Sequence, residues 1–382
     1  MNSLKLIFSK GLYFGPALVF ATLNVIYGTW AIYIPRIKAN LGIDEGQLGL
    51  AIFYMALGTL SMILLAPKII SSFGVGKVTA SGVFLFLISF LIPFSAGSYF
   101  WLCFGMYVVG AFSGLTDVAM NALVSEIEKR DSVHIMSANH GFFSLGGFLG
   151  AGIGGLFLPA DLVPLNHLIL VIAVLFVLNL LFVRKYIQTV SLKLEGVSFK
   201  LEHCKPLLLL AIIAFFIMAS EGAIVDWSAL YLKNISLAKA SWIGLGFTVF
   251  SATMAFGRFV GDGLSIQFGS KVLILVGLIL SMIGFVCVLW VQPLIAVFGF
   301  GLVGLGLSVI IPELFRLGGK TPHIDASISI SFISGVGFFG FLVGPVLLGF
   351  LAEISSLKLS FFALLIFIII SFFAALTLKR NL

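Results

Sequence analysis

The sequence has few charged residues and few cysteines. Only 10% of its 382 residues are Asp, Glu, Lys or Arg, whereas a soluble domain carries roughly 25%. The three cysteines, Cys103, Cys204 and Cys287, are scattered, and their spacing suits neither a disulfide framework nor a metal site. The shortage of charge argues against an ordinary soluble protein, and the cysteine spacing argues against a structural zinc site.

Hydrophobic residues make up 60% of the chain, and the mean hydropathy is +1.20. The 42 glycines fit a membrane protein, because glycine is commoner in membrane-spanning helices than in soluble ones. The net charge of +7 comes from basic residues spread over short connections. This distribution favours a membrane protein with basic cytoplasmic loops and gives no indication of nucleic-acid binding.

Twelve apolar runs are long enough to cross a bilayer, which takes roughly 20 residues in a helix. Strands of a membrane barrel would be about 10 residues long and would alternate in hydropathy, so the runs predict helices. The first run follows Lys10 and is expected to be a span, not a cleavable signal peptide. The predicted spans are 12–35, 47–67, 76–97, 99–125, 133–158, 165–187, 206–232, 240–264, 271–291, 293–317, 325–350 and 358–378.

The basic residues predict how these spans are oriented. If both termini are cytoplasmic, 17 of the 22 Lys and Arg residues fall on the cytoplasmic side. This bias satisfies the positive-inside rule. We therefore expect a multi-pass protein of the bacterial inner membrane with both termini in the cytoplasm.

Four short segments recur in the same order in the two halves of the chain, and the separation between partners shrinks steadily. A 6+6 duplication explains this, and an even number of spans gives both halves the same topology. The expected fold is an all-α membrane protein with a six-helix bundle at 1–187, a cytoplasmic linker at 188–205 and a second bundle at 206–382. The paired segments are GTWAIYI (28–34) with VDWSALYL (225–232), FGVGKV (73–78) with FGSKV (268–272), GLTDVAMN (114–121) with GLSVIIPE (306–313), and SLGGFLG (144–150) with SGVGFFG (334–340).

The chain resembles the major facilitator superfamily. GRFVGDGLSIQFGSK at 257–271 is similar to the signature between that family's eighth and ninth spans. DVAMNALVSEIE, SANHGFFSLGGFLGA and EGAIVDWSALYL are similar to its fucose-permease-related, sugar-type branch. The first half departs from the signature, because Ala66 and Pro67 stand where Gly261 and Asp262 stand in the second. The resemblance implies two six-helix bundles that rock about a solute cavity lined by spans one, four, seven and ten.

Asp117 is an ionisable residue at membrane depth, and it shares one helical face with Gly114 and Asn121. Such a residue indicates function by default, because burying it unpaired is costly. We expect His140, at a similar depth on the next span, to pair directly with Asp117 and to bind or relay a proton with it. The alternative is a hydrogen-bonded lock between spans four and five, to which Asn121 and Ser144 would contribute.

Glu221 lies near the middle of span seven, at the position equivalent to Asn24 in span one. Because no Lys or Arg is expected near it, we predict that it gains and loses a proton, although it could also be a protonated structural residue. Polar residues at one depth in equivalent helices are typical of a midplane binding site. The predicted solute contacts are Asn24, Tyr27, Trp30, Asn121, Glu221 and Trp227, and the predicted proton-coupling residues are Asp117, His140, Glu221 and Asp226. Trp30 and Trp227 could instead belong to the interfacial aromatic belt.

Four residues near the expected cytoplasmic ends are predicted to form a gate. Glu313 and Arg316 are three residues apart, a spacing that permits an ion pair, and the pair could also anchor a loop. Arg258 and Asp262 belong to the loop signature and are expected to hold the inward-closed arrangement. The glycine runs of spans five and eleven, from 146 to 154 and from 337 to 344, are expected to bring helix backbones close together.

These observations predict a secondary active transporter for a small polar solute such as a sugar or polyol. Alternating access with proton symport is expected, with the solute, protons and lipid as the partners of a monomer. No nucleophile, metal or cofactor constellation is evident, so neither an enzyme nor a bound cofactor is expected. The alternatives are a proton-driven exporter of drugs or siderophore-like metabolites and, from another class, a membrane sensor that transports nothing.

Overall fold

The computed structural model describes residues 3–43, 45–157, 163–190, 205–239, 242 and 245–378. All regular structure among these residues is helical, and none of them forms a strand. The all-α prediction is therefore confirmed. The helices of the first half are α1 (Ser3–Ser9), α2 (Gly11–Leu41), α3 (Glu45–Phe73), α4 (Val75–Ser89), α5 (Leu91–Phe94), α6 (Tyr99–Asp131), α7 (Met136–Phe157) and α8 (Pro164–Tyr186).

The second half has the same succession of long helices. It contains α9 (Leu208–Asn234), α10 (Leu245–Phe268), α11 (Ser270–Leu289), α12 (Pro293–Leu307), α13 (Ile310–Gly319), α14 (Ala326–Ile354) and α15 (Leu357–Leu376). Several helices run beyond the predicted spans, as α3 and α6 do at their C-terminal ends. The apolar runs end before the helices do.

The predicted twelve spans correspond to twelve helical columns in the described part of the chain, because two columns are each built from two helices. α4 continues into α5, and α12 continues into α13. Pro93 and Pro312 explain the interruptions. Proline has no N–H to donate to the carbonyl four residues earlier, and the helices break at Phe90 and at Ser308–Val309, close to those carbonyls.

Ten helices or helical columns of the described residues are long and apolar enough to cross a membrane. The two remaining columns are α7 and α10, which pack against each other. Both carry polar side chains that meet in the interior of the molecule, including His140 on α7 and Arg258 on α10. These two helices thus contribute polar side chains to the contact between the two halves of the chain.

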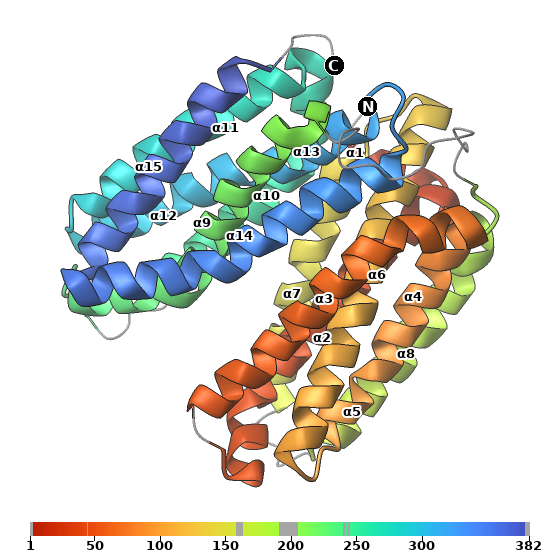
Figure 1. The fold of residues 1–382 in the computed structure, drawn as a ribbon, viewed down its shortest axis with the longest axis horizontal. Helices are drawn as coiled ribbons and strands as arrows, with labels where there is room; N and C mark the ends of the chain where they lie inside the picture. The colour runs from red at the N-terminus through yellow and green to blue at the C-terminus, as the bar shows by residue number, and fades with distance from the viewer. Residues whose placement is uncertain are drawn as a thin grey trace.

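Helices α1 to α8 and α9 to α15 form two groups (Figure 1). The groups meet at the end where α1 begins and α15 ends, and they diverge toward the opposite end. The predicted bundle boundaries stay a prediction, and residues 191–204 of the predicted linker lie outside the described residues. We call the end where the groups meet the closed end.

In both groups, glycines allow the backbones of two helices to approach closely. A Cβ added to Gly146 or Gly150 of α7 would lie 2.2 and 2.1 Å from the carbonyl oxygens of Ala21 and Val25 on α2. The equivalent Gly340 of α14 would meet the carbonyl oxygen of Phe215 on α9 at 2.2 Å. Small residues allow such close backbone approach in membranes. The expected glycine packing is confirmed for these positions, while the side-chain position of 154 lies outside the described residues.

Two further glycines mark the repeat. Gly74 between α3 and α4 and Gly269 between α10 and α11 have φ of 90° and 80°. A positive φ favours glycine, because any other side chain would be strained there. The two turns occupy equivalent places in the FGVGKV and FGSKV segments, so the duplication is visible in the backbone as well as in the sequence.

We expect Gly146→Ala to destabilise the first group. The added methyl would overlap the Ala21 carbonyl oxygen, and overpacking of this kind typically costs about 1–3 kcal/mol. Gly263→Ala on α10 is the matched control, because a Cβ there meets nothing within 4 Å. Thermal unfolding of the purified variants in detergent should show a lower midpoint for Gly146→Ala alone. Equal midpoints for the two variants would contradict close packing of α2 on α7.

Candidate functional site

Several pairs of helices connect the groups at the closed end. In the first seam, α7 of the first group packs on α10 and α13 of the second, and α6 packs on α13. In the second seam, α3 packs on α14. The first seam is strongly polar and holds most of the predicted gate residues. No ion pair among the described residues joins α3 to α14 in the second seam.

Arg316 on α13 is the centre of a buried cluster at the first seam. Its Nε and Nη2 donate to the Glu128 carboxylate of α6 at 3.1 and 3.2 Å, and Nη1 donates to Ser265 Oγ at 3.0 Å. It also forms ion pairs with Asp262 of α10 and with Glu313. The ion pair expected from the spacing of Glu313 and Arg316 is therefore present. We call Glu128, Asp262, Ser265, Glu313 and Arg316 the arginine cluster.

Two carboxylates of this cluster also cap the start of α7. Glu128 Oε1 accepts the backbone N–H groups of Ile135 and Met136 at 2.6 and 2.7 Å. Asp262 accepts those of Ser137 and Ala138 at 2.9 and 2.7 Å. The first N–H groups of a helix have no partner inside it, and the helix dipole favours negative charge there. Asp262 therefore ties α10 to α7 across the seam.

Every side chain of the arginine cluster is almost inaccessible to solvent. The side chains of Arg316, Asp262 and Glu128 are 1%, 0% and 2% exposed. A buried charge is stable only when it is paired and its remaining hydrogen-bonding groups are satisfied. Separating α10 and α13 from α6 and α7 would break the Arg316–Glu128 ion pair and the bonds from Asp262 to the start of α7, so the cluster stabilises the closed end.

A second set of polar residues lies further from the helix ends at the closed end than the arginine cluster does. Asn121 Nδ2 donates to the backbone oxygen of Asp117 at 2.9 Å and to its carboxylate at 3.3 Å. The Asn121 side-chain oxygen lies 3.1 Å from Nε2 of His140 on α7. An amide oxygen only accepts, so the imidazole donates from Nε2. Asp117 also faces Ser334 of α14 in the opposite group.

The same set continues across the first seam. Ser144, one turn after His140, directs its hydroxyl to the His140 carbonyl oxygen at 3.4 Å. Arg258 of α10 donates from Nη1 to Ser144 Oγ at 2.6 Å, and its Nη2 lies 3.5 Å from the Glu221 carboxylate of α9. We call Asp117, Asn121, His140, Ser144, Arg258 and Glu221 the polar chain. It connects carboxylates from the two groups through residues of four helices, and the step from His140 to Ser144 runs through the His140 backbone carbonyl.

The polar chain corrects two expectations. A direct pair between Asp117 and His140 is wrong, because Asn121 lies between them, one turn along α6 and on the same face. The expectation that Glu221 has no countercharge is also wrong. Arg258 lies near the middle of α10, not at its end as the predicted span 240–264 suggested, and its long side chain reaches Glu221.

The other predicted solute contacts do not converge with the polar chain. Asn24 donates to the Phe143 carbonyl oxygen at 2.9 Å, and Tyr27 donates to Ser113 Oγ at 2.6 Å. Trp30 is 5% exposed and packs edge-on against Phe90 and Phe94, so its ring offers no face to a solute in this arrangement. Trp227 is half-buried on α9, and the side chain of Asp226 lies outside the described residues.

Glycines in the GRFVGDG segment allow α10 to approach its neighbours. A Cβ on Gly261 would lie 2.4 Å from Ser137 Oγ of α7, and one on Gly257 would lie 2.2 Å from Ser308 Oγ. Ser137 Oγ donates to the Arg258 carbonyl oxygen at 2.7 Å. These close contacts bring Arg258 and Asp262 within reach of α7.

The second seam has no equivalent of Asp262, in agreement with Pro67 at that position. There Ser331 of α14, 5% exposed, donates to the Ile63 carbonyl oxygen of α3 at 2.5 Å. A Cβ on Gly335 would contact the Ile63 side chain at 3.4 Å. The charged connections between the groups are therefore concentrated in the first seam, as far as the described residues go.

Glu128 belongs to the candidate site, and the sequence did not lead us to predict it. It lies seven residues after Asn121, so Asp117, Asn121 and Glu128 share one face of α6. That spacing could have identified it. Ser265, which donates to Glu313 at 2.9 Å and accepts from Arg316, carried no comparable signal, because a serine in an apolar helix commonly bonds to its own backbone.

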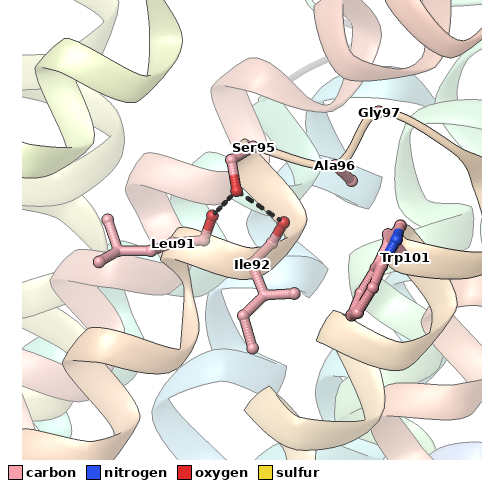
Figure 2. Close-up of a pocket in the computed structure, with 6 residues that line it drawn as sticks. All are labelled: Leu91, Ile92, Ser95, Ala96, Gly97 and Trp101. Carbon is pink, nitrogen blue, oxygen red and sulfur yellow. Dashed lines mark hydrogen bonds between the residues drawn. The ribbon is translucent and has the colours of Figure 1, made fainter.

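A pocket of about 470 Å³ lies far from both polar sets, where α5 ends and α6 begins (Figure 2). Ser95 in its lining donates to the Leu91 and Ile92 carbonyl oxygens at 2.7 and 3.4 Å, and Trp101 closes one side. None of its six lining residues is charged. It has no feature of a site for a polar or charged solute.

Comparison with known proteins agrees with this arrangement. Residues 17–321 match the model of the Major Facilitator Superfamily. The chain is 29% identical to an uncharacterized MFS-type transporter of Yersinia pestis over 335 residues, which is 87% of this chain and 86% of that protein. The match to the family model extends over most of the chain.

Solved structures show the same fold at low identity. A crystal structure of the transporter FucP in the outward conformation superimposes with a TM-score of 0.85 at 15% identity, covering 95% of this chain and 97% of FucP. A variant of the Escherichia coli fucose:proton symporter FucP gives 0.82 at 15% identity, with 94% and 97% covered. The chain thus belongs to the Major Facilitator Superfamily and is a multi-pass membrane transport protein, not an enzyme.

Proposed function

We propose that the protein is a proton-coupled symporter for a small polar solute, a sugar, polyol or related compound, and that it works as a monomer by alternating access. The observation that supports this most strongly is the polar chain. It places two carboxylates, Asp117 and Glu221, in opposite helix groups and joins them through the seam that must open. A proton bound on Glu221 would weaken its ion pair with Arg258, which also donates across this seam to Ser144.

The closed end is proposed to face the cytoplasm of a bacterium, with the protein in the inner membrane. The excess of basic residues on this side supports the orientation. In that orientation the two groups diverge toward the outside (Figure 1). Arg258, Asp262, Glu313 and Arg316, together with Glu128, then form the cytoplasmic gate. The similarity to FucP crystallised in the outward conformation is consistent with this orientation.

The solute is proposed to bind between the groups, above the polar chain. Glu221, with a side chain 25% exposed, and the half-buried Asp117 offer acceptors for solute hydroxyls. Tyr27 and Trp227, also half-buried, would contribute aromatic surface from α2 and α9. Asn24, Trp30 and Asn121 hold neighbouring helices in this state, so a direct role for them requires rearrangement. The fucose:proton symport named for the FucP relative is consistent with this solute class.

Ligand-induced stabilisation followed by proton flux tests the proposal. A panel of hexoses, deoxyhexoses, polyols, amines and organic anions is screened by thermal unfolding, because a ligand at 100 times its Kd stabilises the folded state by about 2.7 kcal/mol. The solute that stabilises most is then added to proteoliposomes that contain a pH indicator. We expect the vesicle interior to acidify as the solute enters, without an imposed gradient.

Two outcomes would contradict the proposal. Uptake of the solute without proton movement would exclude symport, and stabilisation by large apolar drugs but by no sugar or polyol would favour an exporter. Everted vesicles decide the direction, because an exporter would load them when their interior is acidified. Empty liposomes and liposomes with heat-denatured protein serve as controls for proton leak.

A further inference from the structure

Arg258 is a buried cation whose only ion-pair partner among the described residues is Glu221. The Arg258 side chain is 7% exposed, and Glu221, at 3.5 Å, is 25% exposed. The guanidinium also donates to Ser144 Oγ at 2.6 Å, while its Nε makes no hydrogen bond within the described part of the chain. The buried member of the pair thus depends on a carboxylate that solvent can reach.

Contacts with α7 at the first seam cover Arg258. Ser144 on α7 belongs to the first helix group, and Arg258 and Glu221 belong to the second. When the groups separate at this end, α7 leaves and water can solvate the guanidinium. While the seam is closed, the guanidinium depends on the negative charge of Glu221, because a buried charge without its counter-ion is strongly unfavourable.

We propose that Arg258 makes closure of the α7–α10 seam conditional on a negative charge at Glu221. Ionised Glu221 stabilises the closed end. Loss of that charge, by protonation from the open side, leaves Arg258 buried without an anion and favours opening. Arg258 is therefore a positioning residue that links the charge of a solvent-accessible carboxylate to the state of the gate. The inference rests on the proposed function only in naming the proton as the ligand of Glu221.

Of the titratable side chains around Arg258, Glu221 is the one that we expect to take up the proton. His140 on α7 is also titratable and lies within the electrostatic influence of Arg258. It is buried, and its ring is hydrogen-bonded to Asn121. Asp262, one turn further along α10, is occupied by Arg316 and by the start of α7. Of Glu221, His140 and Asp262, Glu221 has the side chain most exposed to solvent.

Cysteine accessibility at the second seam measures opening independently of transport. In a background with Cys103, Cys204 and Cys287 replaced by serine, Ser331→Cys places a thiol that α3 covers while the end is closed. The second seam reports separation of the whole groups, because neither Arg258 nor Glu221 contributes to it. Maleimide labelling rates are measured in detergent, without solute and without a gradient, for Glu221→Gln, Glu221→Asp, Arg258→Gln and the double variant Glu221→Gln/Arg258→Gln.

We expect Glu221→Gln to be labelled at least tenfold faster than the parent, because it leaves Arg258 without its anion. Glu221→Asp keeps the charge and should be labelled at close to the parental rate. The double variant should return most of the way to that rate, since no unpaired buried cation remains. Acidification should accelerate labelling of the parent and leave Glu221→Gln unaffected. Arg258→Gln alone should have the smaller effect of the two single changes, because the remaining carboxylate can be solvated.

A labelling rate of Glu221→Gln equal to that of the parent would overturn the inference, as would a double variant labelled as fast as Glu221→Gln. Acid-accelerated labelling that persists in Glu221→Gln would assign the response to Asp117 or His140 and contradict the proposal equally. Thermal unfolding of each variant separates opening of a folded protein from unfolding. Failure of proton symport in proteoliposomes would leave these labelling results unchanged, so the two proposals fail separately.

Discussion

Arg316→Gln should open the closed end of the protein. The substitution leaves Glu128, Asp262 and Glu313 buried without the cation that they share. Removing one partner of a buried ion pair costs about 3–5 kcal/mol. If opening relieves this cost, the closed arrangement loses roughly a factor of 10² to 4 × 10³, since each 1.4 kcal/mol is a factor of ten. The labelling rate of Ser331→Cys should rise by that order.

Arg130→Gln is the matched control for this prediction. Arg130 pairs with Asp131 at 2.7 Å on the same face of the molecule, but its side chain is 52% exposed. An exposed ion pair contributes about 0–1 kcal/mol, so the rate should change little. Arg316→Lys should lie between the two, because lysine keeps the charge but cannot donate to three carboxylates in the planar geometry of a guanidinium. Equal labelling of Arg316→Gln and Arg130→Gln would show that the cluster does not hold the gate.

The membrane architecture could be predicted from the sequence because it depends on local properties. Apolar runs of the required length specify the spanning helices, and all twelve predicted spans coincide with helical columns. The glycine runs predicted the close contacts of α7 with α2 and of α14 with α9, because only a residue without a side chain allows such an approach. The ion pair of Glu313 with Arg316 follows from their spacing on one helix.

The contacts across the seams could not be predicted in the same way. Glu128 and Arg316 are 188 residues apart, and their pairing depends on how α6 meets α13 when the groups close. The pairing of Glu221 with Arg258 depends on the register of α10 against α9. A shift of that register by one residue would turn Arg258 by about 100° around the helix, at 3.6 residues per turn. Hydropathy does not determine register at this precision.

The asymmetry of the two seams was visible in the sequence, and its consequence became clear only in the structure. Pro67 replaces the aspartate that would match Asp262. The structure adds that the second seam then relies on the hydroxyl of Ser331 against a backbone oxygen. Charged contacts restrain one side of the closed end much more than the other. Opening therefore requires the breaking of the first seam, where both the arginine cluster and the polar chain lie.

Asp117→Asn is expected to abolish proton-driven accumulation while it preserves exchange of solute across the membrane. Asparagine has nearly the same shape and can keep the contact with Asn121, but it cannot release a proton. A pH step of one unit supplies 1.36 kcal/mol per proton, which supports about tenfold accumulation, and this ratio should fall to about one in the variant. Asp131→Asn, at the C-terminal end of the same helix and remote from the polar chain, should accumulate solute as the parent does. Undiminished accumulation by Asp117→Asn, measured in proteoliposomes under an imposed pH gradient, would exclude Asp117 as the proton carrier and leave Glu221 as the carboxylate of the polar chain that could fill that role.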